Sequence, residues 1–310
     1  MATQGTPPMM SSILPITKNA EAPDRFSTVL VAVYAVVLLC GTISLALMIN
    51  IIRANTRSIT SITVLNLIFT HFLFLLTVPF RIYYYAAHRW DLNIGWCKII
   101  SSMIHIHMYM SFIFYVIILI SRLLTFHYKA EQVAVCRRLH TLLISSLVWV
   151  LVLVMVPWIL YFHYGKHIEE VNAVNNNTNG TTVPQVCFKF GKNITSTAMV
   201  LNYIISVIIV VATTVLTVLQ ARVLLVVYRK HGDGCMSQQD FLAQLKSLCF
   251  ALIMVVCFIP YHMFRLYYIS HHELQDVNEV FLSLTTFTCL DMLTFLGRGS
   301  YCVCLRGTAA

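Results

Sequence analysis

The sequence predicts an all-α membrane protein, a bundle of seven transmembrane helices with the N-terminus outside and the C-terminus inside. Of its 310 residues, 58% are apolar and only 11% are charged, which leaves too few charges to cover a soluble protein of this size. The apolar residues gather in seven runs that are long enough to cross a bilayer as helices. The net charge of +9 lies in short clusters between these runs, so we expect membrane lipids around the chain and no nucleic-acid partner.

The seven predicted spans divide the chain into an outside tail (1–26), a membrane domain (27–303) and a short inside tail (304–310). The spans cover residues 27–52, 60–87, 98–126, 139–163, 197–228, 242–269 and 277–303. The first span is free of charge, and the sixth carries Lys246 and Arg265 near its two ends, where long side chains can reach the headgroups. The fifth is rich in β-branched residues, but its length and its lack of turn residues favour a helix over a strand.

The orientation of the spans follows from charge and from glycosylation signals. With the N-terminus outside, more Lys and Arg residues fall on the inside segments, as the positive-inside rule requires. Three Asn-x-Thr acceptor sequences start at Asn176, Asn179 and Asn193, all between spans four and five, in a segment that this orientation places outside. We therefore expect these three asparagines to be glycosylated.

The chain has ten cysteines, most of which fall within spans or in predicted inside segments. Only Cys97 and Cys187 lie in outside segments, where the compartment is oxidising, so they are the candidate disulfide. The alternative is a pair of free thiols. Cys302 and Cys304 lie at the inner end of the seventh span, next to the membrane surface, and are candidates for palmitoylation.

Short motifs occur on the predicted spans in a recognisable order. They are Asn66 to His71 on span two, Ser121-Arg122-Leu123 on span three, Trp149 and Pro157 on span four, Cys257-Phe258-Ile259-Pro260 on span six, and Asp291 to Phe295 on span seven. Together they resemble the rhodopsin-like (class A) G-protein-coupled receptors over about residues 27–300. The stretch from Cys257 to Tyr268 resembles the purinergic-type branch. The resemblance implies a plasma-membrane receptor without a cofactor that relays an outside signal to a heterotrimeric G protein.

The resemblance assigns a switch to the inner half of the bundle. In the family, an arginine at the position of Arg122 pairs with an acid when inactive and is released toward the G protein when active. Here the adjacent acid is replaced by Ser121, and Asp240 at the foot of span six is the expected substitute partner. The alternative role for Arg122 is an interfacial anchor.

His71 replaces the span-two acid that, in the family, helps to hold a sodium ion together with the residue matching Asp291. A hard cation prefers oxygen ligands, so we expect a His71–Asp291 interaction in place of the ion. The alternative is a histidine that is hydrogen-bonded within the bundle and otherwise inert.

The outer half of the bundle holds the candidate ligand residues. They are Arg81 and Tyr84 at the end of span two, His105 and Tyr109 on span three, and Phe258, Tyr261, His262 and Arg265 on span six. Guanidinium groups bind carboxylate and phosphate bidentately, so these residues predict an acidic ligand, such as a lipid acid, with a hydrophobic part. The span-seven positions expected to face it are Val277 and Phe281. Alternatively, Glu273 or Asp276 neutralises Arg265 in a structural latch.

The sequence contains no enzyme signature, such as a phosphate-binding glycine loop or a Gly-x-Ser-x-Gly motif. His105 and His107 are too close in sequence to share one helical face and lack a third ligand nearby, so we expect no metal site. At Ser121, Phe258 and Met292 the chain departs from the residues of the family motifs. These departures leave one other function open. The chain could be a constitutively active or scaffolding seven-span protein that does not respond to a ligand.

Overall fold

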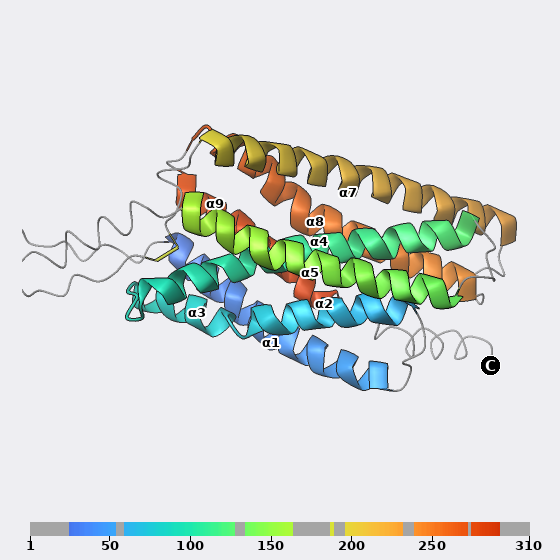
Figure 1. The fold of residues 1–310 in the computed structure, drawn as a ribbon, viewed down its shortest axis with the longest axis horizontal. Coiled ribbons are helices and arrows are strands. Elements are labelled where there is room, and N and C mark those ends of the chain that lie inside the picture. Colours follow the sequence, from blue (N-terminus) through green and yellow to red (C-terminus); the bar gives the residue numbers. More distant parts are fainter. Residues whose placement is uncertain are drawn as a thin grey trace, which may run out of the picture.

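The computed structural model describes residues 25–53, 59–127, 134–163, 187–188, 196–231, 239–271 and 274–291, and the regular elements in these ranges are all helical. The α-helices are α1 (Arg25–Arg53), α2 (Ile59–Leu75), α3 (Val78–Ala87), α4 (Ile94–His127), α5 (Ala134–His163), α7 (Ser196–His231), α8 (Gln239–Tyr268) and α9 (Gln275–Leu284), and α9 continues into a 3-10 helix, η3 (Thr285–Leu290). They run along the long axis of one elongated bundle (Figure 1).

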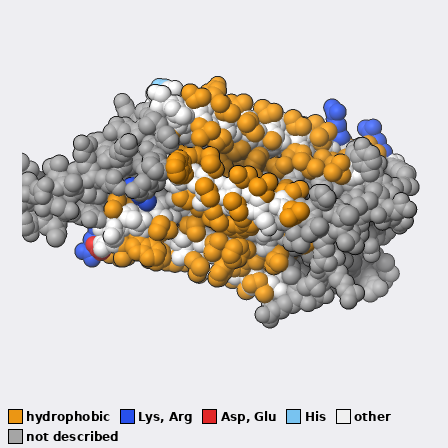
Figure 2. All heavy atoms as spheres, viewed as in Figure 1, with side chains coloured by type: hydrophobic (Ala, Val, Ile, Leu, Met, Phe, Trp, Pro, Cys, Tyr) orange, Lys and Arg blue, Asp and Glu red, His pale blue; other side chains and the backbone are white. Residues whose placement is uncertain are grey.

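The helices have the length and composition of membrane spans. Five segments are long and apolar enough to cross a bilayer: Phe26–Ile49, Ile62–Ala87, Ile94–Phe126, Ser196–Arg229 and Ala243–Tyr268; a shorter apolar segment, Leu143–Ile159, lies in α5. Hydrophobic side chains cover the middle of the face in Figure 2, and Lys and Arg lie toward its two ends. This distribution suits a protein surrounded by lipid along its middle and by water at both ends.

The second predicted span is interrupted. Residues 60–87 form two helices, α2 and α3, with a turn at Leu76 and Thr77 between them. Pro79 stands in the first turn of α3; its ring clashes with the carbonyl four residues earlier, and it has no N–H to donate. Within the turn, the Thr77 hydroxyl donates to the Phe74 carbonyl, at 2.7 Å. Beyond the turn, Arg81 and Tyr84 point into the bundle and are buried.

The core is apolar and runs through the bundle, and a few polar contacts join its helices. Gly41 lets α1 approach its neighbours, because a Cβ at this position would lie 3.1 Å from Leu75 and 3.4 Å from Cys289. The Trp149 indole donates to the Asn66 side chain at 3.0 Å and links α5 to α2. α5 packs against α2 and α4, whereas α7 packs mainly against α8 and also against α4.

Candidate functional site

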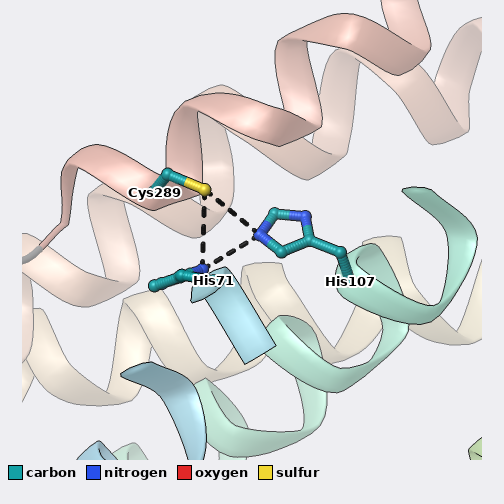
Figure 3. Close-up of side chains that lie close together, drawn as sticks. All are labelled: His71, His107 and Cys289. Atoms are coloured by element: carbon teal, nitrogen blue, oxygen red, sulfur yellow. Dashed lines mark hydrogen bonds between the residues drawn. The ribbon is translucent and has the colours of Figure 1, made fainter. Parts of the chain in front are cut away.

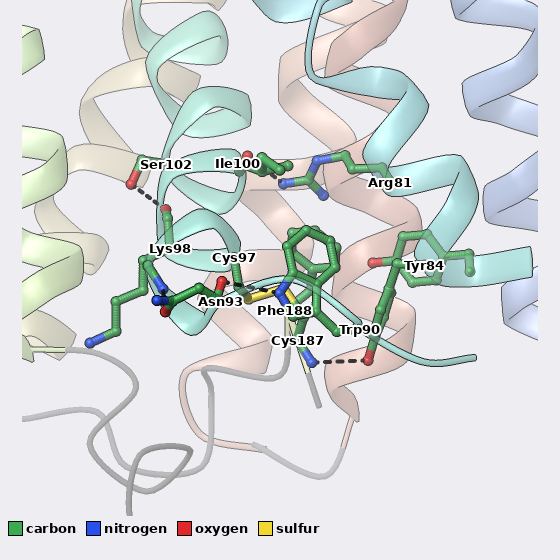
Figure 4. Close-up of a disulfide and its surroundings, with 12 residues drawn as sticks. Arg81, Tyr84, Trp90, Asn93, Cys97, Lys98, Ile100, Ser102, Cys187 and Phe188 are labelled. Atoms are coloured by element: carbon green, nitrogen blue, oxygen red, sulfur yellow. Dashed lines mark hydrogen bonds between the residues drawn. A yellow bond between two sulfur atoms is a disulfide. The ribbon is translucent and has the colours of Figure 1, made fainter. Parts of the chain in front are cut away.

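One end of the bundle is closed by a disulfide between Cys97, at the start of α4, and Cys187, with 5.8 Å between the Cα atoms. The Cys187 backbone N–H donates to the Tyr84 hydroxyl at 3.3 Å. The Phe188 ring packs edge-on against Tyr84, with 5.0 Å between the ring centroids, and also against Trp90. The disulfide and this aromatic cluster hold residues 187–188 over the helix ends (Figure 4). We call this end of the bundle the disulfide end.

Arg81 is buried just beneath the disulfide. Its guanidinium donates to the Tyr34 hydroxyl at 3.3 Å and to the Ile100 carbonyl at 3.2 Å. It lies 3.9 Å from the Glu279 carboxylate and 4.5 Å from the centroid of the Phe188 ring. Arg81 therefore joins α1, α3, α4 and α9 and has an acidic partner that the sequence analysis did not identify.

A cavity of about 390 Å³ lies beside this cluster, between α4, α5, α7, α8 and α9. Its polar lining consists of Ser101, His105, Asn202, Arg265, Gln275, Asn278 and Glu279, together with the Tyr109 and Tyr268 side chains. The residues from α5 are all apolar: Leu151, Val152, Met155, Val156 and Ile159. The cavity therefore has a polar wall and a hydrocarbon-like wall.

Among the residues that the structure describes, Arg265 is the arginine that lines the cavity. Its guanidinium donates to the Asn202 side chain at 3.1 Å and lies 5.8 Å from the ring centroid of Tyr261. Of its two alternative acidic partners, Glu273 lies outside the described residues, and pairing with Asp276 stays a prediction. Glu279 lines the same cavity.

The prediction of which residues of span seven face the ligand is wrong. Val277 and Phe281 do not line the cavity, whereas Glu279 does. The Phe281 ring stacks on Phe264 of α8, with 4.5 Å between the centroids. This stacking turns the Phe281 side chain toward α8, and the sequence of a short helix does not reveal such a contact.

Three of the eight predicted ligand residues line the cavity, namely His105, Tyr109 and Arg265. The others do not, because they are engaged elsewhere in the bundle. Arg81 and Tyr84 support the disulfide end, as described above. Phe258 is buried against Phe112 and Tyr115, Tyr261 is a buried core residue, and His262 lies 3.1 Å from the Ser206 hydroxyl of α7.

The residues matched to the family's sodium site meet in the middle of the bundle. His71 Nε2 lies 3.4 Å from the Asp291 carboxylate, so the structure brings these two residues together. The Tyr115 hydroxyl donates to the other oxygen of Asp291. All three side chains are buried.

The opposite end of the bundle carries Ser121 and Arg122 in the last turns of α4. The Ser121 carbonyl accepts a hydrogen bond from the Thr125 hydroxyl at 2.8 Å, and Arg122 is partly exposed. Asp240 belongs to α8, but its side chain lies outside the described residues, and so the Arg122–Asp240 pair stays a prediction. The candidate modification sites Asn176, Asn179, Asn193, Cys302 and Cys304 also lie outside the described residues.

Comparison with known proteins shows to which protein family the chain belongs. The profile of the 7 transmembrane receptor (rhodopsin family) matches residues 42–294. The chain is 35% identical over 295 residues to the human probable G-protein coupled receptor 141, covering 92% of this chain and 93% of the relative. It is 24% identical to the chimpanzee (Pan troglodytes) probable G-protein coupled receptor 34, over 93% of this chain and 77% of the relative. It is 28% identical to the human lysophosphatidic acid receptor 4, over 74% of this chain and 60% of the relative.

These relatives are receptors rather than enzymes, and they agree with the purinergic-type branch that the motif around Pro260 predicts. The matched segment of 42–294 reaches from α1 to three residues past Asp291 and includes every described helix from α2 to α9. The chain is a multi-pass protein of the plasma membrane and belongs to the rhodopsin family of seven-transmembrane, G-protein-coupled receptors.

Proposed function

We propose that the receptor binds an amphiphile, with an anionic headgroup and a long apolar tail, in the cavity at the disulfide end and relays this signal to a heterotrimeric G protein. The observation that carries the proposal is the two-sided cavity, in which Arg265 lies on one wall and the residues of α5 form an apolar wall. A guanidinium suits a phosphate or carboxylate, and the apolar wall suits a hydrocarbon chain.

Glu279 narrows the chemistry of the headgroup. Its carboxylate lines the same cavity as Arg265 and would repel a bare anion placed against it. A headgroup with a hydroxyl or an ammonium group beside its anion can contact both residues, the anion with Arg265 and the donor with Glu279. We therefore favour a lysophospholipid over a simple fatty acid.

A relative's name supports this class. The lysophosphatidic acid receptor 4, 28% identical over 236 residues, is named for a lipid that combines a phosphate, a free hydroxyl and one acyl chain. The proposal for the present chain rests on its own cavity, and this relative makes a lipid the first ligand class to test.

The cavity reaches the membrane-facing surface between α5 and α7. Leu151, Met155 and Ile208 line it and are also 51%, 50% and 57% exposed. Each of these two helices packs against α4, and their other main neighbours differ, α2 for α5 and α8 for α7. We call this boundary the α5–α7 seam and propose that the apolar tail enters through it from the bilayer.

The two ends of the bundle then have different roles. A disulfide persists in an oxidising compartment, so the disulfide end would face outside and receive the ligand. The opposite end, with Arg122, would face the cytoplasm and the G protein. Arginines inside membrane spans are functional candidates by default.

The ligand test uses cells that express the receptor and report G-protein activation. Lysophosphatidic acid, lysophosphatidylserine and lysophosphatidylcholine with one common acyl chain are the probes. For a probe that activates, both Arg265→Ala and Arg265→Lys should weaken its potency, by about 1–3 kcal/mol, because lysine lacks the bidentate fork. The matched control is Arg89→Ala, at an arginine of the same end that is exposed and pairs with Asp91. Unchanged potency in both Arg265 variants would remove Arg265 from the site.

The coupling test compares the wild type with Arg122→Ala at equal surface expression. A receptor that signals through Arg122 should lose G-protein activation, both basal and probe-induced, in this variant. If none of the probes activates the wild type and Arg122→Ala leaves basal activity unchanged, the proposal is contradicted and the scaffolding alternative is favoured.

A further inference from the structure

We propose that His71, His107 and Cys289 form a binding site for a zinc ion in the middle of the bundle. Figure 3 shows the three side chains converging from α2, α4 and η3. His71 Nδ1 lies 2.9 Å from His107 Nε2, and Cys289 Sγ lies 3.6 Å from the first nitrogen and 3.4 Å from the second. The residues are 1%, 0% and 2% exposed. Their potential ligand atoms all lie within 4.8 Å of one another.

The spacing of these atoms is close to what a tetrahedral zinc site needs. Zinc–nitrogen bonds of about 2.0–2.1 Å and zinc–sulfur bonds of about 2.3 Å place two ligand nitrogens roughly 3.3 Å apart and a nitrogen and a sulfur roughly 3.6 Å apart. The sulfur of Cys289 already lies at such distances. The two histidine nitrogens need to separate by a few tenths of an ångström, which small rotations of the rings supply. A water molecule can take the fourth position.

The surroundings of His71 match those of a metal-bound histidine. Its second nitrogen, Nε2, lies 3.4 Å from the Asp291 carboxylate, and Tyr115 donates to the same carboxylate. Metal-binding histidines commonly donate their other ring N–H to a carboxylate, which fixes the tautomer and makes the ligating nitrogen a stronger base. Donation to Asp291 leaves Nδ1 of His71 without a proton and directed toward His107 and Cys289.

The charges of the site also favour a divalent metal. Zinc binding converts the Cys289 thiol to a thiolate by releasing its proton. The thiolate and the Asp291 carboxylate together balance the two positive charges of the ion, so the buried cluster as a whole becomes neutral. A neutral cluster avoids the large cost of an unbalanced charge inside a membrane protein. Two imidazoles and one thiolate suit zinc, whereas sodium and magnesium prefer oxygen ligands.

The zinc ion would cross-link three elements, α2, α4 and η3, that the disulfide in the described part of the chain does not join to one another. Without a metal, the same atoms can form a hydrogen-bonded pair in which His107 donates to His71. The two states differ in the protonation of Cys289, which is a thiolate with zinc bound and a thiol without it. They also differ in stability. An ion that binds only the folded chain stabilises it by mass action, so zinc should raise the unfolding temperature.

The experiment uses the full-length receptor, purified in detergent and stripped of metal with a chelator. Zinc is supplied from a buffered stock, bound zinc is measured by elemental analysis, and unfolding is followed by a thermal-shift assay. We expect one more bound zinc per chain in the wild type than in Cys289→Ser or His107→Gln, and a higher unfolding temperature with zinc than with magnesium. The matched control is Cys249→Ser, which removes a free, partly buried cysteine of α8 and should leave zinc binding unchanged.

Two further measurements separate a ligand from a merely structural residue. Asp291→Asn should weaken zinc binding by about 10–100-fold without abolishing it, because this residue orients His71 rather than binding the metal. Cobalt should give a thiolate-to-metal absorption band in the wild type that is lost in Cys289→Ser. Equal zinc binding by the wild type and Cys289→Ser would overturn the proposal. If that variant does not fold, a wild type that shows no cobalt–thiolate band overturns it equally.

Discussion

Arg81 shows how one residue can organise the disulfide end. It is fully buried, yet it contacts a hydroxyl, a carbonyl, a carboxylate and an aromatic ring from different parts of the chain. A buried guanidinium is costly unless it is paired and hydrogen-bonded. Its main role in this structure is therefore structural, and Arg265 is the better candidate for a ligand contact.

The Arg81–Glu279 pair leads to a first prediction. Arg81→Met should lower stability by about 1–3 kcal/mol, because it removes the buried hydrogen bonds to Tyr34 and Ile100 and leaves the partly buried Glu279 carboxylate without its guanidinium. The double variant Arg81→Met with Glu279→Gln should recover part of this loss, which a thermal-shift assay in detergent can measure. Arg89→Met, in the exposed pair with Asp91, is the control and should unfold like the wild type. Purely additive losses in the double variant would show that the two residues are not coupled.

The disulfide leads to a second prediction. The bond joins residues 90 positions apart, so its loss frees a long loop in the unfolded chain. Cys97→Ser or Cys187→Ser should cost about 2–4 kcal/mol and reduce the amount of receptor at the cell surface, measured by antibody labelling of intact cells. Cys40→Ser, which removes a free cysteine of α1, serves as the control. Mass spectrometry that finds Cys97 and Cys187 as free thiols in surface protein would contradict the bond.

At the scale of helices, the expected contact between the ends of α4 and α8 leads to a third prediction. If Asp240 holds Arg122 in the inactive state, Asp240→Asn releases it and favours the active state. A change of about 1.4 kcal/mol raises a small active population roughly tenfold. Basal G-protein activation, compared at matched surface expression, tests this expectation.

The same region offers a comparison for that test. The side chains of Gln220 and Gln244 are hydrogen-bonded at 2.6 Å and join α7 to α8. Gln244→Leu removes this link, adds no charge beside Asp240 and leaves Arg122 and Asp240 intact. Basal activity equal to wild type in Asp240→Asn would contradict the switch, and a rise of similar size in both variants would assign it to helix packing in general.

The sequence predicted the helices better than the side-chain contacts. Hydropathy is summed over about 20 residues, so it indicates the helices of the bundle well. The family motifs led to the prediction that His71 and Asp291 interact, and the two side chains lie 3.4 Å apart. The turn at Leu76 was missed, although Pro79 is a local signal for it. Glu279 and Cys289 were missed because their partners, Arg81 and His107, lie far away in sequence. Only the register of α9 and η3 against the other helices brings these pairs together.

For the whole molecule, the direction of the chain through the membrane gives a fourth prediction. If the disulfide end faces outside, the segment with Asn176, Asn179 and Asn193 is exposed to the glycosylation machinery. Treatment of receptor from mammalian cells with an N-glycosidase should increase its gel mobility. Replacement of all three asparagines by glutamine should remove that shift, and Asn202→Gln on α7 is a control outside any acceptor sequence.

An unchanged shift in the triple variant would place the glycans elsewhere. The absence of a shift in the wild type would remove the support that glycosylation gives to this orientation. A protease added to intact cells provides a second readout, because it reaches only the segments on the outside.

The α5–α7 seam has a consequence for pharmacology. A lipid that reaches the cavity through the seam first partitions into the bilayer, so its concentration in the membrane governs occupancy rather than its concentration in water. The apparent potency of such a ligand then depends on the amount of membrane in the assay and on any carrier protein that holds the lipid in solution. Dose–response curves become comparable between laboratories only when they are expressed as ligand per lipid.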